Sequence, residues 1–142
     1  MVSLARVLMH ERDLLETLLF RLEEAALVVA ADHDRWWGRA ARDLDDAVLT
    51  VRRTELLRAI AALEASLELG AEPGATLRAL AAAADQPARS VLLDHREAIR
   101  ALSAEIVAAA QRLQVAGGEQ HAHVVRRPGV VCELPSLEAF LR

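Results

Sequence analysis

The fold class is decided by residues 3–31, which read SLARVLMHERDLLETLLFRLEEAALVVAA. Apolar residues recur there in alternating steps of four and three, which is typical of one buried face of an α-helix. The face consists of Leu4, Leu8, Glu11, Leu15, Leu18, Leu22, Ala25 and Val29. Glu11 is its single charged member, and we expect this carboxylate at the edge of the face, paired with an arginine at the surface.

A second long helix is predicted after the polar corner Asp32-His33-Asp34, because either aspartate can cap its first turn. Its first half carries an apolar face of Trp37, Ala41, Leu44, Val48 and Val51. After the polar run 52–55 and a step of five, the pattern resumes as Leu56, Ile60, Leu63 and Leu67. The shift predicts that the buried face of the helix rotates midway and changes its packing partners. Gly70 is the expected stop.

The rest of the chain predicts one short helix, one long helix and a tail. Thr76 can cap the short helix, which holds Leu77 and Leu80. A long helix then runs to about residue 115, with an apolar face of Leu92, His95, Ile99, Leu102, Ile106, Ala109 and Leu113. We expect an all-α fold over residues 1–116: an antiparallel bundle of long helices, with a coiled-coil-like hairpin, a further long helix and a short helix. Residues 117–142 are expected to form a C-terminal tail with a short amphipathic segment.

Composition excludes several classes of function. Apolar residues make up 54% of the chain and aromatic residues only 3%, so the core must consist mainly of Leu, Ala, Val and Ile. The net charge of −4 does not provide the basic face that nucleic-acid binding needs. The longest apolar run, 25–31, is too short to cross a bilayer, and acidic residues interrupt the N-terminal segment before any run of signal-peptide length. With one cysteine, Cys132, a cytoplasmic location is expected.

Nothing in the sequence predicts catalysis or a bound cofactor. A Gly-rich phosphate loop and a zinc-binding H-E-x-x-H pattern are both missing, and the carboxylates alternate with arginines on polar helix faces. His121, His123 and Cys132 are the only metal-like set, but a tetrahedral zinc site needs four ligands. We therefore expect a protein that is not an enzyme and that holds neither metal nor cofactor.

The amino-acid sequences of three segments resemble those of the FlgN family of flagellar export chaperones. His10-Glu11-Arg12-Asp13-Leu14-Leu15, followed by Leu22-Glu23-Glu24, is similar to the first-helix pattern of the family. Residues 52–58, RRTELLR, resemble its second-helix motif, and residues 74–80, GATLRAL, resemble the loop before its third helix. The likeness covers residues 3–115. The tail, with its Gly117-Gly118 break and its Arg-Arg-Pro-Gly turn at 126–129, departs from the family pattern.

The resemblance implies a cytoplasmic chaperone for hook–filament junction proteins, the flagellar hook-associated proteins, with export-gate components as further partners. Family members hold an aggregation-prone terminal segment of the client until export and contact it toward their own C-terminus. That placement implies client-binding residues on the last long helix and the tail: Leu92, Ile99, Leu102, Ile106, Leu113, Leu137, Phe140 and Leu141.

Three questions stay open at the level of sequence. A structural coiled-coil module that dimerises or acts as an adaptor, without a client, would use apolar faces of the same kind. Leu134, Leu137, Phe140 and Leu141 would either pack back on the bundle and mask its groove or be presented to a partner. Trp36 and Trp37 point about 100° apart on a helix, so one can seal the corner while the other is exposed to anchor a partner.

Overall fold

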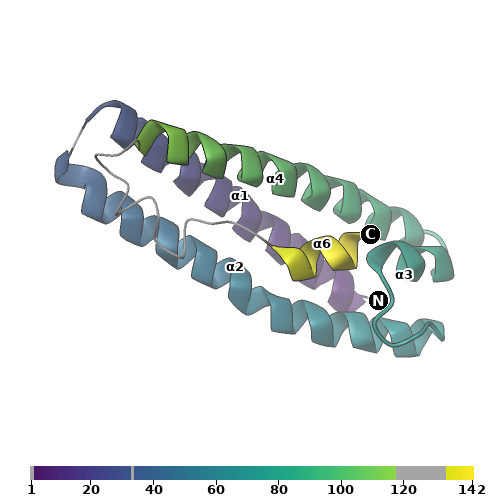
Figure 1. Ribbon diagram of the computed structural model, residues 1–142. Helices are drawn as coiled ribbons and strands as arrows, with labels where there is room; N and C mark the ends of the chain where they lie inside the picture. The colour runs from purple at the N-terminus through teal and green to yellow at the C-terminus, as the bar shows by residue number, and fades with distance from the viewer. Residues whose placement is uncertain (1, 33, 118–133) are drawn as a thin grey trace. The chain divides into compact units, whose positions relative to one another are not determined.

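A computed structural model describes residues 2–32, 34–117 and 134–142 of the chain. The described residues form helices without strands, in an antiparallel bundle of long helices, so the expected all-α fold is confirmed (Figure 1). The long helices are α1 (Val2–Ala30), α2 (Asp34–Leu69) and α4 (Ala88–Gly117), and the short ones are α3 (Leu77–Ala83) and α6 (Pro135–Leu141). Among these helices, none combines the length and hydrophobicity needed to cross a membrane.

The apolar face predicted for α1 is the buried face of that helix. Every one of its eight positions is at most 5% exposed, and this includes Glu11 at 1%. The expectation that Glu11 lies at the edge of the face and pairs at the surface is therefore wrong, because its carboxylate is enclosed in the core. Each of the five leucines contributes about 1.5–3 kcal/mol by leaving water, so α1 is held by this face along its whole length.

The helix ends at Gly70 and Thr76 follow the expected local chemistry, and the corner between α1 and α2 lies at Asp32 and Asp34. Asp32 adopts a left-handed φ of 54° after α1, and α2 begins at Asp34, whose carboxylate lies in the first turn. At the other end of α2, Gly70 has a φ of 65°, a conformation that glycine reaches without a Cβ clash. The hydroxyl of Thr76 accepts a hydrogen bond from the Ala79 amide at 3.3 Å and caps α3.

The buried face of α2 does not rotate, which corrects the sequence prediction. Beyond Val51 it continues through buried Thr54, Arg58, Ala61 and Ala65, in steps of three and four. The apolar set predicted to replace it points to solvent: Leu56 is 68%, Ile60 49%, Leu63 47% and Leu67 72% exposed. At 100° per residue these four lie opposite the buried face. The second half of α2 therefore has a buried face of alanines and polar residues and an exposed face of leucines and isoleucine.

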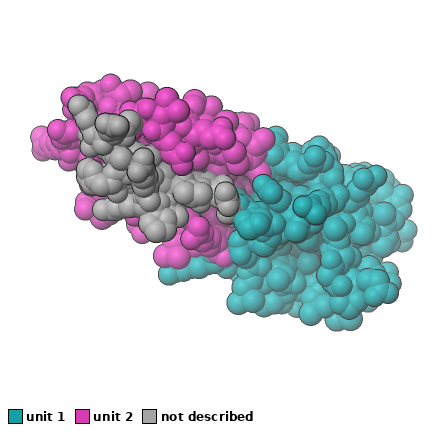
Figure 2. Space-filling view, viewed as in Figure 1, with its two compact units in different colours: residues 1–13, 53–101, 134–142 teal, residues 14–52, 102–133 magenta. Residues whose placement is uncertain are grey.

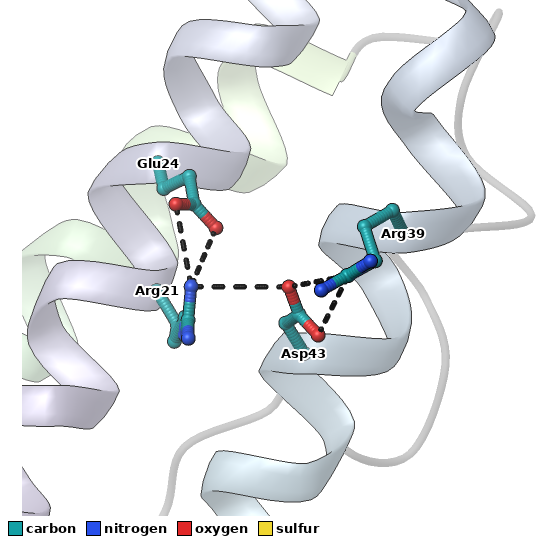
Figure 3. A network of polar contacts seen from close by, with 4 residues as sticks. All are labelled: Arg21, Glu24, Arg39 and Asp43. Carbon is teal, nitrogen blue, oxygen red and sulfur yellow. Dashed lines mark hydrogen bonds and ion pairs between the residues drawn. The ribbon is translucent and has the colours of Figure 1, made fainter.

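Two compact units divide the chain (Figure 2). Each of them contains a segment of every long helix. Unit 2 comprises residues 14–52 and 102–133, of which 118–133 lie outside the described ranges. Within it, α1 and α2 are joined by a polar network (Figure 3). Arg21 Nη1 lies 3.1 Å from Glu24 Oε1 and 3.8 Å from Asp43 Oδ2, and Arg39 Nε lies 3.2 Å from the same Asp43 oxygen.

Unit 1 comprises residues 1–13, 53–101 and 134–142, so it contains α3 and α6 complete. The buried side chains of α6 and its N-cap residue, Leu134, Leu137 and Leu141, belong to the core of this unit, and α6 contacts α3. The features described next as a candidate site all lie in unit 1.

Candidate functional site

The exposed apolar face of α2 is the first feature of the candidate site. We call Leu56, Ile60, Leu63 and Leu67 the α2 ridge. Single exposed apolar residues are normal on a protein surface, but a contiguous set marks a surface that binds something. Four such side chains within three turns of one helix form a contiguous set.

A groove of about 530 Å³ runs between the second half of α2 and α6. Small side chains widen it, because Ala59, Ala62 and Ala139 leave space where larger residues would fill it. Leu56 and Leu63 of the α2 ridge line it on one side and Phe140 on the other. We call this feature the α2–α6 groove. Its apolar lining and small residues suit a helix that approaches closely, as in recognition of an amphipathic helix.

The far wall of the groove is α6, which is fixed in place at both ends. Leu137 and Leu141 are buried, so one face of this short helix belongs to the core. Arg96 of α4 donates hydrogen bonds to the Leu141 carbonyl at 2.7 Å and to the Arg142 carbonyl at 3.1 Å. A guanidinium at a helix C-terminus satisfies carbonyls that have no further turn to bond.

Arg58 joins three helices beneath the groove. The residue is 4% exposed, and its guanidinium donates to the Glu11 carboxylate of α1, forming a buried ion pair. It also donates to the Ser136 hydroxyl of α6 at 3.3 Å and lies 5.6 Å from the centre of the Phe140 ring. The cation therefore connects the core carboxylate to the wall of the α2–α6 groove.

Burial raises the pKa of Glu11 above its ordinary value, because a charged carboxylate is poorly stabilised away from water. The positive charge of Arg58 and its hydrogen bond act in the opposite direction, as does a hydrogen bond from Thr54, while the nearby charge of Glu55 adds to the rise. The core of unit 1 thus contains an ionisable pair that would be costly to separate.

His95 is the second buried polar residue of this unit that sequence reasoning singled out, and it packs inside the bundle as expected. Its Nδ1 accepts a hydrogen bond from Arg12 Nη1 at 3.3 Å. Burial lowers the pKa of His95, and the Arg12 charge lowers it further, against a smaller opposing effect of Asp94.

These effects give His95 a testable influence on the pH dependence of stability. In the unfolded chain His95 takes up a proton near its ordinary pKa of 6.5, whereas in the folded chain it does so only at lower pH. The free energy of unfolding therefore decreases as the pH falls from 6.5 toward the lowered pKa. We expect the His95→Gln variant to lose less stability than the wild type between pH 7 and pH 5, measured by urea unfolding. His10→Gln, at an exposed position of α1, is the matched control, and equal slopes for all three proteins would contradict the prediction.

Most of the residues predicted to bind a client lie in the protein's own core. Leu92, Ile99, Leu137 and Leu141 are buried in unit 1, and Ile106 and Leu113 are buried in unit 2, where Leu102 is half-buried. Phe140 is half-buried and is the member of the predicted set that lines the α2–α6 groove. A client-binding role for the other seven stays a prediction.

The groove itself was missed by sequence reasoning, although a signal for it was present. The step of five between Val51 and Leu56 places the α2 ridge away from the earlier buried positions, and it reflects a separate exposed face and not a rotation of the core face. The tail residues, for which two readings were open, pack back on unit 1 and form one wall of the groove.

Two further predictions from the sequence concern the tryptophan pair and the metal-like set. Trp37 is buried, whereas Trp36 is 51% exposed with the Arg35 guanidinium 4.9 Å from its ring centre. The metal-like set His121, His123 and Cys132 lies outside the described residues. Within the described ranges, no group of three or more metal-ligating side chains comes together.

Comparison with known proteins gives no family for this chain: no family model matches it, and no curated protein or solved structure matches it significantly.

Proposed function

We propose that this protein is an export chaperone of the FlgN type that acts in the cytoplasm. It binds hook–filament junction proteins in a stoichiometric complex and keeps them soluble and export-competent before secretion by the flagellar type III apparatus. The choice of client rests on the resemblance of residues 3–115 to that family. The observation that carries the binding role is the α2–α6 groove, where Leu56 and Leu63 are exposed beside a floor of alanines.

An amphipathic helical segment of a client fits the chemistry of this groove. Leucines and Phe140 offer apolar contact on both sides, and Glu55 gives the rim a polar group. A client segment that is disordered before export would order itself as a helix on binding and cover its apolar face. Binding of this kind needs shape and apolar area and no catalytic group, which agrees with a protein that acts by stoichiometric association.

Co-purification with hook–filament junction proteins of the same genome tests the proposal, with the mass of the complex as the readout. We expect a stable complex whose affinity falls about tenfold or more in the Ala139→Glu variant, because the longer side chain would fill the space beside Ala139 and bring a charge into the apolar contact with the client. Ala104→Glu, at an exposed position of α4, is the matched control and should bind as the wild type does. Absence of any complex would contradict the chaperone proposal.

The α2 ridge favours a second candidate, a structural module whose task is self-association. Exposed Leu56, Ile60, Leu63 and Leu67 would be covered equally well by another helix of the same kind. A module of this type forms a dimer that added client leaves unchanged, whereas a chaperone gives way to a complex with its client. Sizing of the protein with and without client therefore separates the two functions.

A further inference from the structure

The α2 ridge has the spacing of a coiled-coil seam. Its residues follow one another in steps of four, three and four, as a and d positions of a heptad do. Ile60 and Leu67 then occupy a positions, Leu56 and Leu63 occupy d positions, and exposed Arg53 is the preceding a position. A polar residue at a single a position selects register and orientation in such assemblies, because it must find a partner in the facing helix.

Arg53 selects between the two orientations of a second α2 helix. In a parallel pair it would face Arg53 of the other copy, and the two guanidinium groups would repel. Consider an antiparallel pair in the register that gives every ridge residue an apolar partner on the other helix. Ile60 of one copy then faces Leu63 of the other, and Leu56 faces Leu67. The same register places Arg53 opposite Gly70 at the C-terminal end of the other helix.

The C-terminal end of α2 is suited to receive this cation. The last turn of α2 contains no basic residue, although the carbonyl groups at a helix C-terminus favour a positive charge. Glu68, within that turn, adds a negative charge. Around Gly70, the position of a Cβ would meet no atom within 4 Å, so space is open for a long side chain.

We infer that the α2 ridge binds a second copy of this chain, with the two α2 helices antiparallel and Arg53 of each copy at the C-terminal end of α2 of the other. The inference stands independently of the proposed function. Because Leu56 and Leu63 belong both to the ridge and to the α2–α6 groove, the dimer and the client complex exclude each other. Self-association would then cover the apolar surface while no client is bound.

Sedimentation equilibrium of the full chain tests self-association. The wild-type mass is expected to rise with concentration from 15.5 kDa toward twice that value. Leu67→Glu should hold the mass at the monomer value, because Leu67 lies in the ridge. This position is chosen because Leu67 is not among the groove-lining residues. Leu27→Glu on α1 is the matched control, since Leu27 is 71% exposed and Leu67 72%. Equal helicity of the two variants would show that neither fails to fold.

Disulfide cross-linking tests the orientation, in a chain whose native cysteine is removed by Cys132→Ser. Chains with Leu56→Cys and chains with Leu67→Cys should form a mixed disulfide when oxidised together, and neither should cross-link alone. The two copies of position 56 would be 11 residues apart along the antiparallel pair, or about 16 Å, whereas a disulfide needs Cα atoms within about 7 Å. Cross-linking of each variant with itself, or a wild-type mass that stays at the monomer value, would overturn the inference.

Discussion

Arg58→Ala is expected to lower the free energy of unfolding by about 3–5 kcal/mol, the usual cost of leaving one member of a buried ion pair alone. The pair is enclosed, with Glu11 1% and Arg58 4% exposed, so the Glu11 carboxylate would stay inside the core without its cation. The loss should be smaller at pH 5 than at pH 7. Without Arg58, the pKa of Glu11 rises further, and the carboxylate escapes part of the cost by taking up a proton.

Chemical denaturation of matched variants measures this effect. Arg100→Ala, on α4 in the same unit, removes an exposed arginine and should change stability by no more than about 0.5 kcal/mol. The double variant Glu11→Leu/Arg58→Met replaces the pair by apolar side chains of similar length and should recover most or all of the loss. A loss below about 1 kcal/mol for Arg58→Ala would contradict the buried pair.

The second large effect is expected for α6. Leu137→Ala should cost about 2–5 kcal/mol, because a leucine that is 1% exposed leaves a cavity in the core of unit 1. Deletion of residues 134–142 should cost more than Leu137→Ala does. It also removes buried Leu134 and Leu141 and leaves Arg58 and Arg96 without their hydrogen-bond acceptors on α6.

Denaturant unfolding and binding of a dye that reports exposed apolar surface check this prediction. Glu138→Ala changes an exposed side chain of the same helix and is the matched control for Leu137→Ala. We expect the deletion variant to bind the dye and the control to unfold as the wild type does. A deletion variant with unchanged stability would show that α6 contributes nothing to the core of unit 1.

The sequence predicted the helices well because their apolar spacing is regular. The faces of α1 and of the first half of α2 carry leucine, valine or tryptophan at most of their buried positions, so hydrophobic periodicity alone located the core. Local signals also located the helix ends, since Gly70 and Thr76 act through their own backbone or side chain. Such signals need no knowledge of tertiary contacts.

The candidate site could not be predicted in this way, because two hydrophobic patterns compete in the second half of α2. The exposed pattern contains only leucine and isoleucine, whereas the buried pattern contains Thr54, Arg58 and two alanines. A prediction based on side-chain hydrophobicity chooses the wrong face. Arg58 is buried because Glu11 lies opposite on α1, and that pairing connects residues 47 positions apart. Only the folded chain supplies this information.

Unit 1 is assembled from three stretches that are distant in the sequence. This arrangement affects the order in which its contacts are expected to form during folding. The corner between α1 and α2 forms between residues that are close in sequence. The ion pair of Arg58 with Glu11, in contrast, joins residues 47 positions apart, and the hydrogen bond of Arg58 to Ser136 joins residues 78 positions apart. Closing longer loops costs more chain entropy, so contacts between distant residues tend to form late. Contacts that form after the transition state act mainly on the rate of unfolding. We therefore expect changes in the seven residues of α6 to raise the unfolding rate of unit 1 more than they lower its folding rate.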